Sequence, residues 1–279
     1  MNHSLINVAV LDLYNNEPNE GMRSIKAILN RFNKINNGLI NYTVFDVRAK
    51  DEMPNMAEFD IYISSGGPGC PLPSNEKWEK DYFELMDAIA ENNKKEHTNK
   101  KHVFLICHSF QMMMNHFGYG IIEKRHSPAF GIFPVHKTEI AQNSSIIGKL
   151  PEPFYAVDSR EWQVVKPDME KINATGATLL CHEKIRPHVP YERAIMALRF
   201  SPYMLGVQFH PEADAEGMYR YFERPDKKKF ISEKYGKEKY DEMISYLADP
   251  NKIELTHHII IPSFLVLAVK LLRPEAARI

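Results

Sequence analysis

The most constraining feature of this sequence is a regular alternation of short apolar runs with longer amphipathic ones. Apolar runs of strand length occupy residues 5–13, 40–47, 59–64 and 103–106. Stretches with helical spacing of apolar residues occupy 21–32, 78–90 and 109–117. Strands that alternate with helices in this way need crossover connections, which produce a parallel sheet with helices on both faces. We therefore predict an α/β fold with an open, mostly parallel sheet.

The second half of the chain is richer in strand patterns and then turns helical. Short strands are predicted at 131–138, 154–157, 162–165, 177–181, 194–200 and 205–209. From Asp214 onward the pattern is helical and more charged, which is typical of solvated helix faces. Ile253 to Leu272 predicts a last helix that bends or begins near Pro262.

The composition excludes disordered, collagen-like and disulfide-scaffold proteins. The 279 residues are 44% hydrophobic and 25% charged, which is typical of a globular chain. Lys plus Arg is 35 and Asp plus Glu is 36, so nothing favours a nucleic-acid partner. The three cysteines are scattered and odd in number, which favours a reducing compartment over a disulfide framework.

We find no targeting segment and no membrane span. The apolar stretch 259–272 is short and contains Pro262 and Lys270. His257 and His258 have no further ligands at metal-binding spacing, so we expect no metal, and no motif predicts a cofactor. We expect a cytoplasmic protein.

A cysteine follows the most apolar strand directly. Residues 103–106 run into Cys107, and a helix is predicted to begin beside it. A thiol at such a turn projects from the carboxyl end of the sheet, where a helix N-terminus favours the thiolate and offers N–H groups to an oxyanion. A buried core cysteine is the alternative interpretation.

Two further motifs follow predicted strands. Ser64–Gly69 is a glycine-rich turn whose N–H groups can approach a bound group closely, although it lacks the ending of a phosphate loop. His210 and Glu212 lie at the end of the strand predicted at 205–209. Because side chains of a strand repeat every two residues, both are expected to point to the same side. A carboxylate that orients an imidazole helps deprotonate a thiol. Each motif alone also fits an ordinary turn or loop.

Together the three motifs supply a nucleophile, a base, an orienting acid and oxyanion donors at the carboxyl ends of strands, where open α/β sheets place their sites. SGGPG, the Cys107 turn with Gln111 four residues later, and GVQFHPE resemble the class I glutamine amidotransferases. The similarity covers residues 5–224 and is greatest to the glutaminase domain of GMP synthase and its stand-alone relatives. It implies a flavodoxin-like fold over residues 1–224, followed by a helical extension at 225–279.

The resemblance also implies residue roles. Cys107 attacks the glutamine side-chain amide, and His210, oriented by Glu212, acts as base and then as acid. The N–H groups of Gly67 and His108 form the oxyanion hole. The implied substrate contacts are Gly66, Gln111, Ser159, Arg160 and Trp162.

The turn around Cys107 departs from the family pattern. Leu105 and Ser109 stand where the family usually has glycine. Three functions therefore remain open. The first is a glutaminase that delivers ammonia to an acceptor or a synthetase partner chain. The others are a cysteine hydrolase of γ-glutamyl or related amides and a non-catalytic ligand-binding relative.

Overall fold

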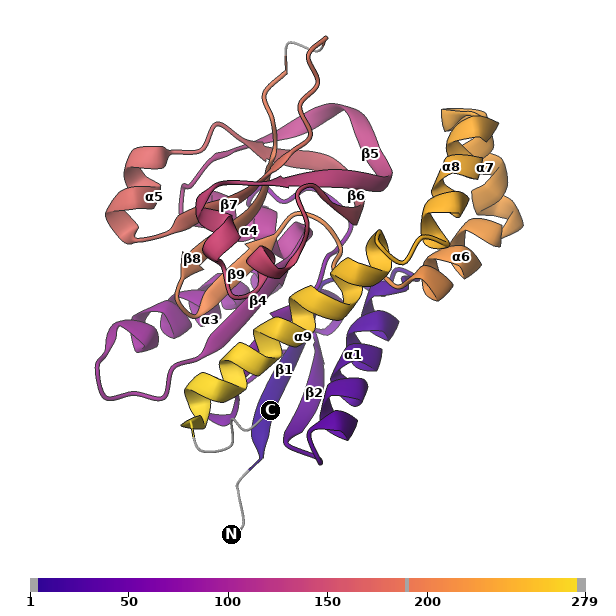
Figure 1. Cartoon of the computed structure of the whole chain (residues 1–279). Helices are drawn as coiled ribbons and strands as arrows, with labels where there is room; N and C mark the ends of the chain where they lie inside the picture. The colour runs from indigo at the N-terminus through magenta and orange to yellow at the C-terminus, as the bar shows by residue number, and fades with distance from the viewer. Residues whose placement is uncertain (1–4, 189–190, 275–279) are drawn as a thin grey trace.

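A mixed sheet organises the computed structural model, which describes residues 5–188 and 191–274. Over these residues the sheet has nine strands in the order β2-β1-β3-β4-β9-β8-β7-β5-β6 (Figure 1). One half, from β2 to β9, is parallel, and the other, from β8 to β6, is antiparallel. This sheet, with its covering helices, confirms the predicted α/β fold of flavodoxin-like type.

The parallel half contains the strands that the sequence pattern predicts best. Its strands are β1 (Ile6–Asp12), β2 (Ile40–Asp46), β3 (Ile61–Ser64), β4 (His102–Ile106) and β9 (Met204–Val207). β3, β4 and β9 are buried along their whole length, because helices cover both faces of this half. Their continuous apolar runs are therefore the expected pattern for central parallel strands.

The antiparallel half differs from the prediction at two strands. It contains β5 (Ile121–Lys137), β6 (Phe154–Val165), β7 (Thr178–Glu183) and β8 (Ile195–Ser201). The strands predicted at 154–157 and 162–165 are one strand, because the polar residues between them pair with each other inside the protein. β5 begins ten residues before the predicted 131–138 and contains a register shift between Lys124 and Ala129.

Helices α1 (Gly21–Ile35) and α9 (Ile253–Leu272) share one hydrophobic core, and α3 (Lys77–Lys94) and α4 (His108–His116) share the other. Figure 1 shows α9 crossing the sheet beside α1. The shorter helices are α2 (Val47–Lys50), α5 (Met169–Thr175), and the 3₁₀ turns η1 (Met56–Glu58), η2 (Ile140–Asn143) and η3 (Ile147–Lys149).

Helix α9 matches the predicted range and contains Pro262 within it. Of the residues described, it forms the one helix long and apolar enough to cross a membrane by length and composition. Its Ile260, Phe264 and Leu265 are buried in the same core as β1 and β4. The core of a folded domain accounts for this apolar character.

Three further helices form a separate group beside the antiparallel half. These are α6 (Ala215–Glu223), α7 (Pro225–Tyr235) and α8 (Lys237–Leu247) (Figure 1). Phe222, Ile231 and Met243 form a small core with Ile132 and Val157 of the sheet. A domain boundary between residues 224 and 225 stays a prediction; α7 and α8 lie beyond it in this small core, and α9 lies beyond it in the core of the sheet.

Candidate active site

Cys107 occupies a sharp turn between β4 and α4. Its φ of 48° and ψ of −98° are unusual for a residue with a side chain and store backbone strain. The neighbouring strand holds the turn, because the Cys107 N–H donates to the Val207 carbonyl at 2.8 Å. The residue is 5% exposed. This is the strand-to-helix geometry that presents a nucleophile at a sheet edge.

The two departures from the family pattern fit this turn without glycine. Leu105 is fully buried in the core that contains α3 and α4. The Ser109 hydroxyl accepts a hydrogen bond from the Ile106 N–H at 2.9 Å and lies 3.0 Å from the Ser64 carbonyl oxygen. Ser109 therefore ties the end of β4 to the end of β3, a link that glycine cannot make.

The glycine-rich turn after β3 lies next to Cys107 and His210. A Cβ atom on Gly67 would lie 2.4 Å from the Leu13 carbonyl oxygen. A Cβ on Gly66 would lie 2.9 Å from His210 Cε1 and 3.7 Å from Cys107 Cβ. A side chain at Gly67 would meet the backbone of Leu13, and one at Gly66 would crowd the His210 imidazole, so close approach favours glycine at both positions.

The predicted oxyanion donors lie beside the thiol. The His108 N–H is the first of helix α4, where backbone N–H groups have no intrahelical acceptor. His108 and Gly67 line a common cavity with Cys107. Burial, reinforced by the positive charge of Arg48, lowers the pKa of the His108 imidazole to about 3, so this side chain is neutral. Its backbone, rather than its imidazole, is the group that suits an oxyanion.

His210 lies between Cys107 and Glu212. Its N–H donates to the Val157 carbonyl at 2.8 Å, and its Nδ1 lies 2.8 Å from Glu212 Oε1. Its imidazole also faces the Cys107 side chain, closely enough for the two groups to interact. Burial disfavours the imidazolium, but the Glu212 carboxylate and the Cys107 sulfur outweigh it and raise the pKa of His210 well above its ordinary value.

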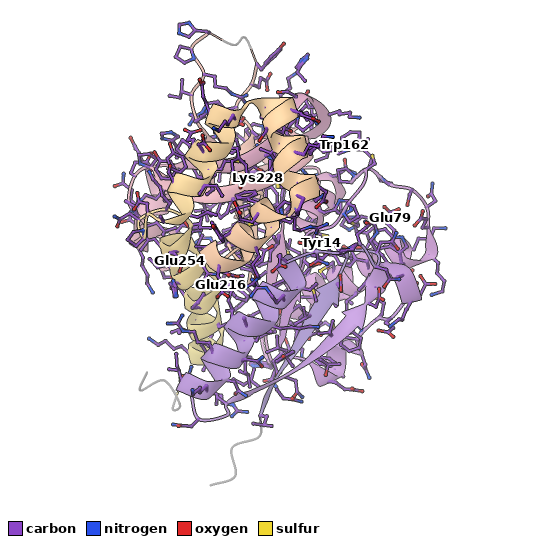
Figure 2. All side chains as sticks on the ribbon, turned by 90° about the vertical axis from the view of Figure 1, so that its right-hand side faces the viewer. Tyr14, Glu79, Trp162, Glu216, Lys228 and Glu254 are labelled. Atoms are coloured by element: carbon purple, nitrogen blue, oxygen red, sulfur yellow. The ribbon has the colours of Figure 1, made fainter. Side chains whose placement is uncertain are left out.

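Two residues at this site are absent from the sequence-based prediction. Tyr14 follows β1, and Figure 2 shows it where the C-terminal helices meet the parallel half of the sheet. Burial, then the charges of Glu212 and Cys107, raise the pKa of its hydroxyl well above its ordinary value. The sequence feature that could have pointed to Tyr14 is its position after a strand that ends at the same edge of the sheet as β4.

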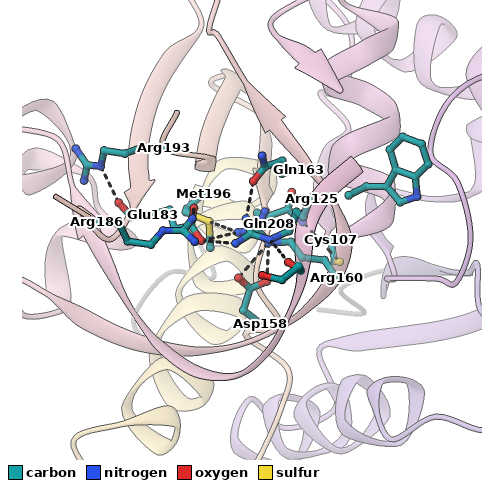
Figure 3. A network of polar contacts seen from close by, with 12 residues as sticks. Cys107, Arg125, Asp158, Arg160, Gln163, Glu183, Arg186, Arg193, Met196 and Gln208 are labelled. Atoms are coloured by element: carbon teal, nitrogen blue, oxygen red, sulfur yellow. Dashed lines mark hydrogen bonds and ion pairs between the residues drawn. The ribbon is translucent and has the colours of Figure 1, made fainter. Parts of the chain in front are cut away.

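The second residue is Gln208, which is fully buried directly after β9. Its Nε2 donates to Cys107 Sγ at 3.6 Å, and Figure 3 shows it beside the sulfur. Gln111 Nε2 donates to Gln208 Oε1 at 3.1 Å and to the Trp162 carbonyl at 2.8 Å. The sequence feature that could have pointed to Gln208 is its position two residues before His210, because residues two apart in an extended chain direct their side chains to the same side.

The predicted substrate segment of β6 brings two carbonyl oxygens to the site. The Ser159 carbonyl lies 3.9 Å from Cys107 Sγ, and the Trp162 carbonyl accepts from Gln111. The Arg160 guanidinium is 1% exposed and lies in a buried ionic network with Asp158 at 2.8 Å and Glu183 at 3.4 Å (Figure 3). Arg160 thus contributes its charge to that network.

A sequence model of the family Glutamine amidotransferase class-I matches residues 20–223. The chain belongs to the class I glutamine amidotransferases. None of the curated protein sequences matches it significantly.

Solved structures of other amidotransferases have the same fold. A glutamine amidotransferase from Thermotoga maritima matches with a TM-score of 0.69 and 16% identity, over 97% of this chain and 100% of that one. One from Methylobacillus flagellatus matches with 0.58 and 15%, over 96% and 92%. The glutaminase domain of Trypanosoma brucei CTPS, with bound acivicin, matches with 0.56 and 14%, over 95% and 94%.

Two cavities meet at Cys107 in this amidotransferase. One, of about 400 Å³, lies on the His210 side and reaches Glu17, Met218 and Tyr221. The other, of about 320 Å³, is lined by Gln111, Trp162 and Lys234 among others. Helix α6 therefore lines the first cavity and helix α7 the second. Within residues 5–188 and 191–274, no three His, Cys, Asp or Glu side chains gather as metal ligands do.

Proposed function

We propose that this protein is a glutaminase-type amidotransferase that hydrolyses the side-chain amide of glutamine through Cys107, His210 and Glu212. One observation carries the proposal: the His210 imidazole faces the Cys107 side chain on one side and lies 2.8 Å from a Glu212 oxygen on the other. This is the arrangement that activates a thiol and holds its base in one tautomer.

In the first half of the reaction, the Cys107 thiolate attacks the amide carbon of glutamine. The carbonyl oxygen becomes an oxyanion, which the N–H groups of Gly67 and His108 stabilise. His210 gives its proton to the amide nitrogen, the carbon–nitrogen bond breaks, and ammonia leaves. A γ-glutamyl thioester remains on Cys107.

In the second half, a water molecule attacks the thioester while His210 removes one of its protons. The carbon–sulfur bond then breaks, which releases glutamate and regenerates the thiolate beside the imidazolium. Glu212 stays ionised and stabilises the positive charge of His210 in this step. The same constellation thus serves both halves of the reaction.

The ammonia goes to an acceptor or to a synthetase partner chain, as the resemblance to GMP synthase implies. Support comes from the family match. Cys70, Cys107 and Cys181 are all free thiols, in keeping with the reducing cytoplasm in which we place the protein.

The direct test is glutamate release from glutamine by the wild type and by Cys107→Ala. We expect steady release by the wild type and none above background by the variant. The assay is repeated with candidate synthetases, because a partner can activate the glutaminase. Equal release by both proteins would overturn the proposal.

The size of the cavity on the His210 side of Cys107 favours one second candidate, a hydrolase of larger γ-glutamyl amides. Ammonia needs far less room than the cavity of about 400 Å³ on the His210 side. A leaving amine with an apolar group would contact Met218 and Tyr221 there. A panel of γ-glutamyl amides decides between the two candidates: a higher kcat/KM for a larger amide than for glutamine selects the second.

A further inference from the structure

A buried amide contacts the reactive sulfur in addition to His210. Gln208 is fully buried, and its Nε2 lies 3.6 Å from Cys107 Sγ, within hydrogen-bond range for sulfur. It follows β9 directly, and its N–H donates to the Met196 carbonyl at 2.9 Å. The side chain therefore approaches the sulfur from a fixed point of the sheet.

The hydrogen bonds around Gln208 determine which end of its amide faces the sulfur. The Trp162 carbonyl can only accept, so Gln111 must present its NH₂ group there, at 2.8 Å. The same Gln111 nitrogen lies 3.1 Å from Gln208, which must therefore offer its oxygen. The Gln208 NH₂ group is then left to face Cys107. The opposite orientation would set two donors against each other.

A thiolate is stabilised by hydrogen-bond donors around the sulfur, whereas a neutral thiol can itself donate to an acceptor. The Ser159 carbonyl, 3.9 Å from the sulfur, suits an S–H donor and repels a thiolate. The Gln208 N–H groups favour the thiolate, because hydrogen bonds to a charged acceptor are the stronger ones. An amide N–H does not titrate, so this donor remains when His210 gives up its proton to the leaving group.

We propose that Gln208 is a second hydrogen-bond donor to the Cys107 thiolate and that Gln111 is a positioning residue acting through it. The chain Trp162 carbonyl, Gln111, Gln208 and Cys107 sulfur stabilises the thiolate before attack and again when it leaves the thioester. This rests on the proposed function for its meaning in catalysis, but the state of the sulfur can be measured without glutamine.

Other charged and titratable groups also act on the sulfur. His210 faces it, and the neutral Tyr14 hydroxyl and the positively charged Arg160 guanidinium lie close enough to interact with it. Glu212 acts through His210. The variants below leave all four side chains in place, so a change in thiol reactivity reports on the amide chain.

The experiment measures iodoacetamide alkylation of Cys107 in the folded protein from pH 5 to pH 9. Exposed Cys70 serves as the internal reference in the same molecule. In Gln208→Leu we expect Cys107 to react about tenfold more slowly than in the wild type at neutral pH, with its profile displaced to higher pH. In Gln111→Leu we expect a smaller loss of about threefold, because Gln208 keeps its contact but loses its support.

The matched control is Gln163→Leu. Gln163 is also a buried glutamine, but its amide bonds to Arg125 and Glu123 instead of the sulfur. Circular dichroism checks the fold of each variant, and Gln208→Met provides a second side chain without N–H groups should Gln208→Leu fail to fold.

Normal alkylation of Cys107 in folded Gln208→Leu or Gln208→Met would overturn the proposal, and so would an equal loss in Gln163→Leu. The two proposals fail separately. Slow alkylation in the Gln208 variants with no glutamine hydrolysis by the wild type contradicts the glutaminase alone. Normal alkylation in these variants with active wild type contradicts the second donor alone.

Discussion

The two halves of the sheet contribute to the site in different ways. The parallel half supplies the proposed reacting groups from the ends of its strands: Cys107 follows β4, the glycine turn follows β3, and His210 follows β9. The antiparallel half contributes from the middle of β6. The backbone carbonyls of Val157 and Trp162 accept from His210 and Gln111, and the Ser159 carbonyl lies 3.9 Å from Cys107 Sγ.

This difference follows from how each half is buried. Parallel strands covered on both faces leave only their ends accessible, so reactive side chains gather there. β6 passes beside the site and alternates its side chains, so that Asp158 and Arg160 are buried while the exposed Ser159 lies between them. We therefore expect changes at strand ends to affect turnover, and changes within β6 to affect stability.

The largest effect is expected at the strand end that carries the base. His210→Gln should lower kcat for glutamine hydrolysis by about a thousandfold, since it removes the proton-transfer group. Glu212→Gln should cost less, about a hundredfold, because Glu212 orients and does not transfer the proton. Steady-state kinetics measure both. The same loss in both variants would contradict the division of roles.

A change inside β6 should destabilise the protein instead. Arg160→Met leaves Asp158 buried without its cation, whereas Glu183 keeps Arg125 and Arg186, and this should lower the free energy of unfolding by about 3 kcal/mol. Lys229→Met is the control; its side chain is 76% exposed, and its loss should stay within about 0.5 kcal/mol. Urea unfolding monitored by circular dichroism compares them. Equal stability of the two variants would contradict the expectation that changes within β6 affect the stability of the protein.

The opposite ends of the parallel strands should matter for stability alone. His102 begins β4 and is 2% exposed, and its Nε2 has no hydrogen-bond partner among the described residues. Burial, only partly offset by Asp60, lowers the pKa of His102 from 6.5 to about 4. The native state then stays neutral here while the unfolded state binds a proton, so stability is lost as pH falls from 6.5 toward 4.

His102→Leu should therefore lose less stability than the wild type between pH 7 and pH 4.5, by up to about 3 kcal/mol. Unfolding free energies at the two pH values measure the difference. Parallel losses in both proteins would show that His102 takes up its proton in the native state as readily as in the unfolded chain.

The sequence predicts the strands of the parallel half, and the position of the candidate site at their ends, for a physical reason. Buried parallel strands are continuous apolar runs; Cys107 follows β4 directly, and Gly67 and His210 lie three residues beyond the ends of β3 and β9. In β6 the prediction failed, because Asp158 and Arg160 have the composition of a loop until their pairing is known. The position of α9 in the core of the sheet likewise depends on tertiary contacts that its apolar pattern does not specify.

Gln208 illustrates the same limit within the site. Its neighbours His210 and Glu212 follow the strand repeat of two, and Gln208 extends it by one step. A glutamine in a strand is, however, usually a surface residue, and its role depends on contacts with Gln111 and Cys107 from other elements. Spacing along one strand predicts which side chains share a direction, but it does not identify the groups they meet.

The central claim is that Cys107, held against His210 in a glycine-lined turn, takes up the γ-glutamyl group. The most direct measurement is peptide mass spectrometry after treatment with a diazo-ketone analogue of glutamine, which alkylates a thiol that accepts the substrate. We predict one adduct per chain, on Cys107, that excess glutamine prevents and that His210→Gln slows strongly. Modification of Cys70 instead, or a Cys107 adduct that glutamine does not prevent, would contradict the account.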